Sequence, residues 1–598
     1  MSRFIIHNVV QTNMNYKLNK PSGKDHKGTF SAAIKRLIPF MAGEKRNIII
    51  AMMAIVVTSG SSLLAPAIIG YTIDTYIKTK DYAGVLKFSG ILAIIYTSGL
   101  ITSYIQTTRM GGVGRRVLFR LRNAVFTKLQ ELPVAFFNQN KAGDLISRIN
   151  NDTDKLNQFF SQALMQFIGS AFVIFGAGIF LLSFNIRLGA AALMPALLVL
   201  IVTKLISSWV KRKNTKSLQA MGGMSAEIQE SLDNFKAIVA FNRLDYFREK
   251  FNTANQANFS ASVKSGLASN IFLPMYSLAS SLAQITVIAY GIYLISTGNI
   301  TIGLLIGFLL YVNSFYGPLR QLASVWQSLQ LALASLDRIS EVLDLESDLL
   351  VVPLEKTSIS SVVEFKNVSF HYTEGIDVLR DISFALQKGK TYALVGPTGG
   401  GKTTIASLMA RLYDPSFGVV FLNGKDIRSF QPEERARKIG FILQEPFLFT
   451  GTVRDNILYN NELYIQYSDE QLFEALEKAN LTGLLSRFEK GLETKVVSSG
   501  DAISLGQKQL IAFMRAVLRN PEILILDEAT ANIDTVTEQL LEEMLEKLPI
   551  DTTRVIIAHR LNTIEHADEI FFVNSGSIVP AGSFDQAVEM LLHGKRES

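Results

Sequence analysis

Long apolar stretches crowd into the first 330 residues of the chain, whereas apolar runs in the remainder are short. Six stretches are long enough to cross a bilayer as helices: about 47–72, 84–107, 161–184, 187–210, 267–296 and 301–325. These stretches carry no lysine or arginine near their centres, except for Lys204 in the fourth stretch. Lys204 lies toward one end of that stretch, so its ammonium group can snorkel to the membrane surface. The pattern predicts an all-α membrane domain with six spans.

The connections between these stretches differ in length and in charge. Three are short, namely 73–83, 185–186 and 297–300. The other two each exceed fifty residues, and nine Lys or Arg lie in 109–160 and nine more in 211–266. By the positive-inside rule, we expect the long connections, both termini and the second half of the chain to face the cytoplasm.

Both long connections show helical periodicity, as in residues 114–129 and 224–232. If each connection folds as a hairpin of two helices of about 25 residues, each arm reaches roughly 35–40 Å beyond the bilayer. The turns of these hairpins fall at residues 137–144 and 233–241. We expect a mechanical contact with a cytoplasmic domain at these turns, and simple solvated loops are the alternative.

From about Val362 the pattern changes to short β-rich runs separated by turns and helices, which is typical of an α/β domain. A glycine-rich loop of the form G-x-x-x-x-G-K-[ST] follows the apolar run 391–395 and precedes a helix-like run. The loop and the next residue are Gly396, Pro397, Thr398, Gly399, Gly400, Gly401, Lys402, Thr403 and Thr404.

This order of strand, loop and helix points backbone N–H groups at a phosphate chain near a helix N-terminus. Lys402 can reach the terminal phosphates, and the hydroxyl of Thr403 can ligate Mg²⁺. The loop therefore predicts binding of a nucleoside triphosphate, and a glycine-rich turn without this role is the alternative.

A second apolar run, 523–526, ends in two acids, Asp527 and Glu528. A continuous aliphatic run suits a parallel strand that is covered on both faces. We expect Asp527 to hold Mg²⁺ through water and Glu528 to act as the general base that polarises an attacking water. An ordinary acidic helix cap after the strand is the alternative.

Three further side chains are candidates on weaker grounds. His559 ends the apolar run 555–558 and could orient water at the γ-phosphate, although a lone histidine is often structural. Gln444 offers an amide that can touch Mg²⁺ or water. Tyr372 could stack on an adenine ring. For Gln444 and Tyr372, a plain surface position remains an alternative.

Composition limits the remaining possibilities. The 598 residues are too many for one core, and the absence of cysteine excludes disulfides and thiolate metal sites. The net charge is +7, and the Lys and Arg residues gather beside the apolar spans, as in an inner-membrane protein. We therefore expect no nucleic acid partner. The predicted domains are a polar tail (1–30), a membrane domain (31–340), a linker (341–361) and a nucleotide-binding domain (362–598).

Together these motifs resemble an ABC transporter half-subunit of the exporter type, from about residue 30 to the end. Matching positions in the membrane half are Pro66–Gly70 with Asp74, Phe137 with Gly143–Arg148 and Asn151–Asp152, and Gly298 with Gly317–Leu319 and Asp337–Ile339. The resemblance implies ATP and Mg²⁺ as cofactors, and it makes Tyr372 the adenine-stacking aromatic and Gln444 a hinge-loop residue. It also makes His559 the switch histidine and places Asp534 in the loop that crosses between two nucleotide domains. The two hairpin turns then correspond to coupling helices, one of which usually docks on the partner's nucleotide domain.

The chain departs from the family at the signature Leu-Ser-Gly-Gly-Gln, which here is Ile503-Ser504-Leu505-Gly506-Gln507. In the family, this segment caps ATP that is held by the opposite phosphate loop, and a leucine adds bulk where close backbone approach is needed. Ser504, Gly506 and Gln507 remain, so ATP can still be clamped while hydrolysis opposite this signature is impaired. We therefore expect a second, non-identical half-subunit with a regular signature and an altered catalytic acid, and a homodimer is the alternative.

The expected function is ATP-driven export of a small molecule, lipid or peptide across the plasma or inner membrane by alternating access. An importer of metal-chelate ligands on the same scaffold is an alternative, since these motifs do not encode direction. A nucleotide-gated channel would call for a degenerate catalytic acid or an added regulatory domain, and neither occurs in the sequence. A membrane-anchored helicase would need nucleic-acid modules and would not need six spans.

Overall fold

The computed structural model describes residues 16–18, 35–346, 351–352, 361–372, 375–497, 503–527, 535–557, 565–582 and 584–593, apart from the side chains of 323, 324, 326, 327, 535 and 591–593. The chain divides into two compact units. The helical unit comprises Leu18–Gln130 and Ala142–Asp344, and the α/β unit comprises Met1–Lys17, Glu131–Lys141 and Leu345–Ser598. The predicted fold class, an all-α membrane domain followed by an α/β domain, is confirmed.

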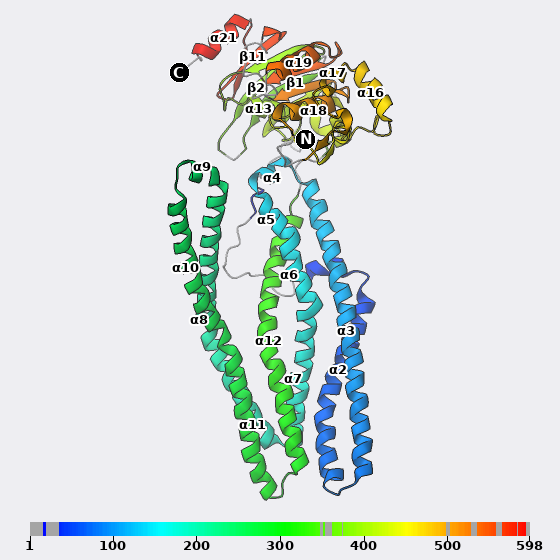
Figure 1. The fold of residues 1–598 in the computed structure, drawn as a ribbon, viewed down its shortest axis with the longest axis vertical. Helices are drawn as coiled ribbons and strands as arrows, with labels where there is room; N and C mark the ends of the chain where they lie inside the picture. Colours follow the sequence, from blue (N-terminus) through cyan, green and yellow to red (C-terminus); the bar gives the residue numbers. More distant parts are fainter. Residues whose placement is uncertain are drawn as a thin grey trace, which may run out of the picture. The chain divides into compact units, whose positions relative to one another are not determined.

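Helices of very different lengths build the helical unit (Figure 1). They are η2 (Ile38–Met41), α2 (Lys45–Thr72), η3 (Ile73–Ile77), α3 (Tyr82–Glu131), α5 (Ala142–Ser147), η4 (Arg148–Asp152), α6 (Thr153–Gln158), η5 (Phe159–Ala163), α7 (Leu164–Phe184), α8 (Ile186–Asp233), α9 (Phe235–Ala240), α10 (Leu244–Asn270), α11 (Phe272–Ser296) and α12 (Ile302–Leu343).

Among the described residues, six helical stretches are long and apolar enough to span a membrane, in agreement with the six predicted stretches. Several continue far beyond their apolar part, so that α3 has 50 residues and α8 has 48. The long connections are therefore helical extensions of the spans, and α8 packs along α10 (Figure 1). Short helix α9 forms the turn between them.

One end of α2 is fastened to α12 by close backbone approach and by a carboxylate. A Cβ on Gly70 would lie 2.7 Å from the carbonyl oxygen of Gly303, so only glycine allows this crossing. The Asp74 carboxylate, just beyond α2, accepts hydrogen bonds from the hydroxyl of Thr301 and, at 2.8 Å, from the backbone N–H of Gly303. It thereby satisfies donors at the first turn of α12, which an isolated helix leaves unpaired.

Two main sheets form the α/β unit. The parallel sheet has the order β12-β11-β3-β10-β9-β6, with β12 antiparallel at its edge, and an antiparallel sheet has the order β2-β1-β4-β5. The strands are β1 (Val363–Phe370), β2 (Leu379–Leu386), β3 (Thr391–Val395), β4 (Phe417–Leu422), β5 (Lys425–Asp426), β6 (Ile439–Ile442), β7 (Gly451–Thr452), β8 (Lys495–Val496), β9 (Ile523–Asp527), β10 (Thr553–Ile557), β11 (Glu569–Asn574) and β12 (Ser577–Pro580). The helices are α4 (Val134–Gln139), α13 (Lys402–Met409), α14 (Pro432–Lys438), α15 (Val453–Ile457), α16 (Asp469–Lys478), α17 (Thr482–Leu485), α18 (Leu505–Val517), α19 (Thr535–Glu546) and α21 (Phe584–His593).

Helix α13 lies in the core that joins the two main sheets. Its Ile405 and Leu408 are buried in one cluster with Phe370 of the antiparallel sheet and Ile525 of the parallel sheet. Strands β3, β9 and β10 are buried at almost every position, as expected for parallel strands covered on both faces. This packing fixes the start of α13 relative to the carboxyl ends of those strands.

Candidate nucleotide-binding site

The glycine-rich loop follows β3 and opens α13, in the predicted order. Gly396 has a φ of +140°, and a Cβ there would lie 2.0 Å from the backbone oxygen of Val573. Gly401, the residue before α13, has a φ of +115°. Both positions demand glycine because L side chains rarely adopt such a backbone, and the resulting loop has no side chain to block a phosphate at these two positions.

The polar side chains of the loop are held in place by short contacts. The Lys402 ammonium donates to the backbone oxygens of Gly396 at 2.9 Å and Pro397 at 3.1 Å, so the cation lies over the loop. The Thr403 hydroxyl donates to Asp527 Oδ1 at 3.2 Å. A hydroxyl and a carboxylate are therefore adjacent, and both are oxygen donors of the kind that Mg²⁺ prefers.

The carboxyl ends of neighbouring parallel strands bring further candidates to the same edge. Asp527 ends β9 opposite Ile557, the last residue of β10, and Ile442 at the end of β6 pairs with Leu526. Gln444 is exposed two residues after β6. Glu528 directly follows β9 in the sequence and His559 follows β10 by two residues, but both lie outside the described residues, as does Asp534.

Tyr372 lies just beyond β1, next to the start of α13. Its hydroxyl is 3.1 Å from the Thr404 hydroxyl, and its ring meets the buried ring of Phe370 edge-on. The side chain is 39% exposed, so the ring remains accessible to a planar ligand. Tyr372 therefore lies within hydrogen-bonding distance of the helix that carries the phosphate loop.

The altered signature begins α18. Ser504 caps the helix, because its Oγ accepts from the backbone N–H of Gln507 at 3.2 Å while the Gln507 side chain accepts from the Ser504 N–H at 3.0 Å. Leu505 is the first helical residue, and Gly506 is buried behind it. The structure thus brings Ser504, Leu505 and Gln507 together at one helix N-terminus.

Sequence reasoning missed an aromatic groove of about 230 Å³ on the α/β unit. Its lining includes Phe447, Phe449, Tyr459, Arg515 and Arg519. The Arg515 guanidinium donates to the backbone oxygens of Asn456 and Phe447, and it lies over the stacked Phe449 and Tyr459 rings. Burial lowers the pKa of Arg515 from its ordinary value, and the same is true of Arg519.

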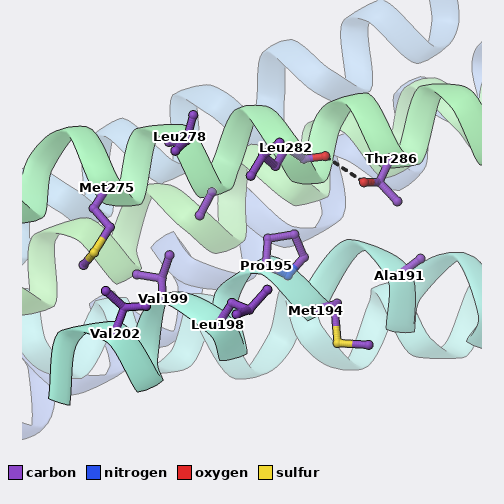
Figure 2. Close-up of a pocket in the computed structure, with 11 residues that line it drawn as sticks. Ala191, Met194, Pro195, Leu198, Val199, Val202, Met275, Leu278, Leu282 and Thr286 are labelled. Atoms are coloured by element: carbon purple, nitrogen blue, oxygen red, sulfur yellow. Dashed lines mark hydrogen bonds between the residues drawn. The ribbon is translucent and has the colours of Figure 1, made fainter. Parts of the chain in front are cut away.

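The helical unit has an apolar hollow of about 460 Å³ between α8 and α11 (Figure 2). Side chains of both helices line it, namely Ala191, Met194, Pro195, Leu198, Val199, Val202, Met275, Leu278, Ala279, Leu282 and Thr286. The Thr286 hydroxyl donates to the Leu282 backbone oxygen at 2.8 Å (Figure 2). Among the described lining residues, Thr286 is the one polar side chain and it is already hydrogen-bonded, so the hollow suits an apolar group and offers little directional recognition.

Known proteins resemble the chain along almost its whole length. The ABC transporter ATP-binding protein YfiC of Bacillus subtilis is 32% identical over 95% of this chain and 93% of its own length. The chain belongs to the ABC transporter family. Residues 48–319 match the family model described as the ABC transporter transmembrane region, and residues 379–531 match the family model described as ABC transporter.

Other members of the family carry more specific names. A multidrug resistance ABC transporter ATP-binding and permease protein of Lactococcus lactis is 32% identical over 83% of this chain and 84% of its own length. A fatty acid ABC transporter ATP-binding/permease protein of Mycobacterium bovis is 32% identical over 84% of this chain and 79% of its own length. The solved structure of a bacterial Atm1-family ABC exporter with ATP bound superposes with a TM-score of 0.78 at 25% identity, and the match covers 93% of this chain and 99% of that one.

These matches establish an exporter-type ABC transporter subunit that binds ATP and couples its hydrolysis to transport. The protein is an integral membrane protein of the plasma membrane, and exporters of this family work as dimers.

Proposed function

We propose that this subunit pairs with a non-identical half-transporter and exports an apolar or amphipathic small molecule, lipid or peptide. The phosphate loop carries the proposal, because an ammonium group that lies over the loop suits a phosphate chain, and a hydroxyl beside a carboxylate suits Mg²⁺. Thr403, Asp527 and Gln444 would hold the metal, which would neutralise phosphate charge. Tyr372 would stack on adenine.

Hydrolysis in this proposal depends on Glu528 as general base and His559 as the group that orients water and the γ-phosphate. Both follow strands whose ends are aligned, since Asp527 of β9 pairs with Ile557 of β10. A base and an orienting group that leave adjacent parallel strands at the same edge can act on one water. Asp534 would follow in the loop that crosses between two nucleotide domains.

Leu505 supports a non-identical partner. The phosphate loop of this chain and the acids Asp527 and Glu528 match the family pattern. The signature that would face the partner's ATP instead carries leucine in place of glycine. One composite site would hydrolyse ATP, using Glu528 of this chain and a regular signature of the partner. The other site, capped by Leu505, would mainly hold ATP.

Coupling to the membrane would use the turns of the two long hairpins. In α9 and just after it, Phe235, Val239 and Phe241 are exposed apolar side chains. We assign a matching helix of the partner subunit to the aromatic groove around Phe449 and Tyr459, because apolar side chains can pack against this stacked pair of rings. Closure of the nucleotide domains would then move the spans from an inward-open to an outward-open arrangement, with both termini in the cytoplasm.

The apolar hollow between α8 and α11 supports this substrate class, because Thr286 is the one polar side chain among its described lining residues and it is already hydrogen-bonded to Leu282. The names of the multidrug and fatty acid relatives agree with a cargo that has a large apolar part. Export is the proposed direction.

A test of the function is Glu528→Gln in the complete complex. ATP turnover should fall to background while ATP binding persists and the closed dimer accumulates. Glu522→Gln is the matched control, because Glu522 pairs with Lys438 near the opposite end of β9. Normal turnover in Glu528→Gln would remove the assigned base.

Pairing is tested by expressing the chain alone. A non-identical partner predicts an unstable or weakly active preparation that gains ATPase activity when the partner is added. A stable ATPase from the single chain, stimulated by transported compounds, would instead establish a homodimer that tolerates Leu505.

A further inference from the structure

Helix α4, which forms the turn of the first long hairpin, belongs to the same compact unit as the nucleotide-binding residues. Phe136 on α4 is fully buried. The next polar residue, Asn138, donates from Nδ2 to the hydroxyl of Tyr413 at 2.6 Å. This hydrogen bond joins side chains that are 275 residues apart in the sequence.

Tyr413 is rigidly placed relative to the phosphate loop because it follows α13 after one tight turn. Arg411 in that turn has a φ of +50° and is buried, and its guanidinium pairs with Asp414 at 2.9 Å. The backbone N–H of Leu412 donates to Ser407 of α13 at 2.9 Å. Helix α13 has eight residues and a length of about 12 Å, so it connects Lys402 at one end with Tyr413 beyond the other.

The ring of Tyr413 also contacts the ring of Tyr372. The two centroids are 5.2 Å apart at an interplanar angle of 86°, which is an edge-to-face arrangement. Both rings contact the fully buried Phe370, at 4.8 Å from Tyr372 and 5.6 Å from Tyr413. Three aromatic rings therefore form one close-packed cluster, in which a shift of one ring displaces the others.

We infer that Tyr413 is a positioning residue that links the adenine-stacking ring of Tyr372 to the coupling helix α4. Its ring supports Tyr372, and its hydroxyl binds Asn138, so the two tasks belong to different parts of one side chain. The inference rests on the proposed role of Tyr372. Nucleotide that stacks on Tyr372 would favour one arrangement of the cluster and thereby one position of Asn138.

The hydroxyl is suited to this task. Burial raises the pKa of Tyr413, and the hydrogen bond from Asn138 opposes the rise. The phenol therefore stays neutral at physiological pH and keeps both a donor and an acceptor.

Separate substitutions distinguish the two tasks. Tyr413→Phe and Asn138→Ala remove the hydrogen bond and keep the rings, whereas Tyr413→Ala also removes the support of Tyr372. Tyr392→Phe is the matched control, because the Tyr392 hydroxyl accepts from the backbone N–H of Gln387 at 2.7 Å in the same unit, and Tyr392 is neither in the ring cluster nor bonded to α4.

The chain has no cysteine, so Lys141→Cys, at an exposed position next to α4, gives the full-length chain a single site for an environment-sensitive dye. The probe is the non-hydrolysable nucleotide AMP-PNP, added to the labelled protein in lipid nanodiscs. Its dissociation constant and the amplitude of the dye signal are measured separately. Wild type and Tyr392→Phe should show the full amplitude.

Tyr413→Phe and Asn138→Ala should at least halve the amplitude and leave the dissociation constant within about twofold, and the double variant should lose no more than either single variant. Tyr413→Ala should weaken binding by roughly 2- to 12-fold, as expected for the loss of an aromatic pair. Unchanged amplitude in Tyr413→Phe, unchanged affinity in Tyr413→Ala, or additive losses in the double variant would overturn the inference. If wild type itself gave no signal, the proposed coupling would fail before the role of Tyr413 was reached.

Discussion

Replacing Arg148 by methionine should destabilise the helical unit more than replacing other arginines of that unit that form exposed ion pairs. Arg148 lies in the π-helical turn η4, and its side chain is 1% exposed. Its guanidinium reaches Asp144 at 3.0 Å and Glu341 at 2.8 Å. These contacts tie the start of the third span's helical extension to the end of α12.

The expected magnitude follows from burial. Removing one partner of a buried ion pair costs about 3–5 kcal/mol, because the other charge loses its partner. Asp144 keeps a second ion pair, with Arg338 at 2.5 Å, and Asp144 and Glu341 are 37% and 24% exposed, so the lower end of that range, about 3 kcal/mol, is expected. With an unfolding entropy of about 2.1 cal/mol/K per residue, such a change lowers the unfolding temperature of a domain of about 300 residues by roughly 4–5 °C.

The assay is thermal unfolding of the purified full-length protein in detergent. Arg248→Met is the control, because Arg248 and its partner Asp245 are 73% and 97% exposed, and such pairs contribute about 0–1 kcal/mol. The double variant Arg148→Met/Glu341→Gln should lose less than the sum of its single variants, since it removes both ends of one pair. Equal shifts for Arg148→Met and Arg248→Met would refute the reasoning.

Three further outcomes are expected. Lys402→Ala should weaken ATP binding by roughly 10- to 150-fold in an equilibrium binding assay, because one charge-assisted contact to phosphate contributes about 1.5–3 kcal/mol; an unchanged affinity would contradict the role of the lysine. Leu505→Gly should leave ATPase activity nearly unchanged if the opposite site lacks its catalytic acid, and should raise the activity of a homodimer. Hydrogen bonds from Arg116 hold the pKa of Glu44 at about 2, below its ordinary 4.5, so the stability that this carboxylate contributes is present above pH 4.5 and is lost as the pH falls toward 2. Glu44→Gln should remove that part of the acid sensitivity in unfolding experiments, and an identical pH profile in the variant would count against it.

Local sequence patterns were sufficient for the phosphate loop and the spans. Gly396 and Gly401 adopt the positive φ values that such a loop needs, and the aliphatic run before Asp527 is a fully buried strand. In these cases the residues that define the feature are consecutive or nearly so. Their chemistry therefore appears in the sequence before any long-range contact is known.

The contact between Asn138 and Tyr413 could not be predicted, because neither residue has a neighbour in sequence that hints at the other. The long connections were correctly read as helical, yet their charges suggested only a cytoplasmic surface. Arg148 is one of the nine Lys or Arg residues in the first long connection, and it is nevertheless buried against Asp144 and Glu341. Burial of a charge depends on a partner that lies elsewhere in the chain, which periodicity does not encode.

The effect of Leu505 on the folding of this chain differs from its effect on nucleotide bound by a partner subunit. The capping box of Ser504 and Gln507 is intact, and leucine has less backbone freedom to lose on folding than glycine has, so the substitution does not weaken α18 itself. Its cost would arise only where a phosphate from another subunit approaches the helix N-terminus and meets a branched side chain. If the site capped by Leu505 had a functional catalytic acid, the leucine would slow ATP hydrolysis there. If that site lacks a catalytic acid, the leucine would leave the rate of hydrolysis unchanged. The bulk of Leu505 therefore agrees with the proposed assembly, in which one site hydrolyses ATP and the other site retains its nucleotide.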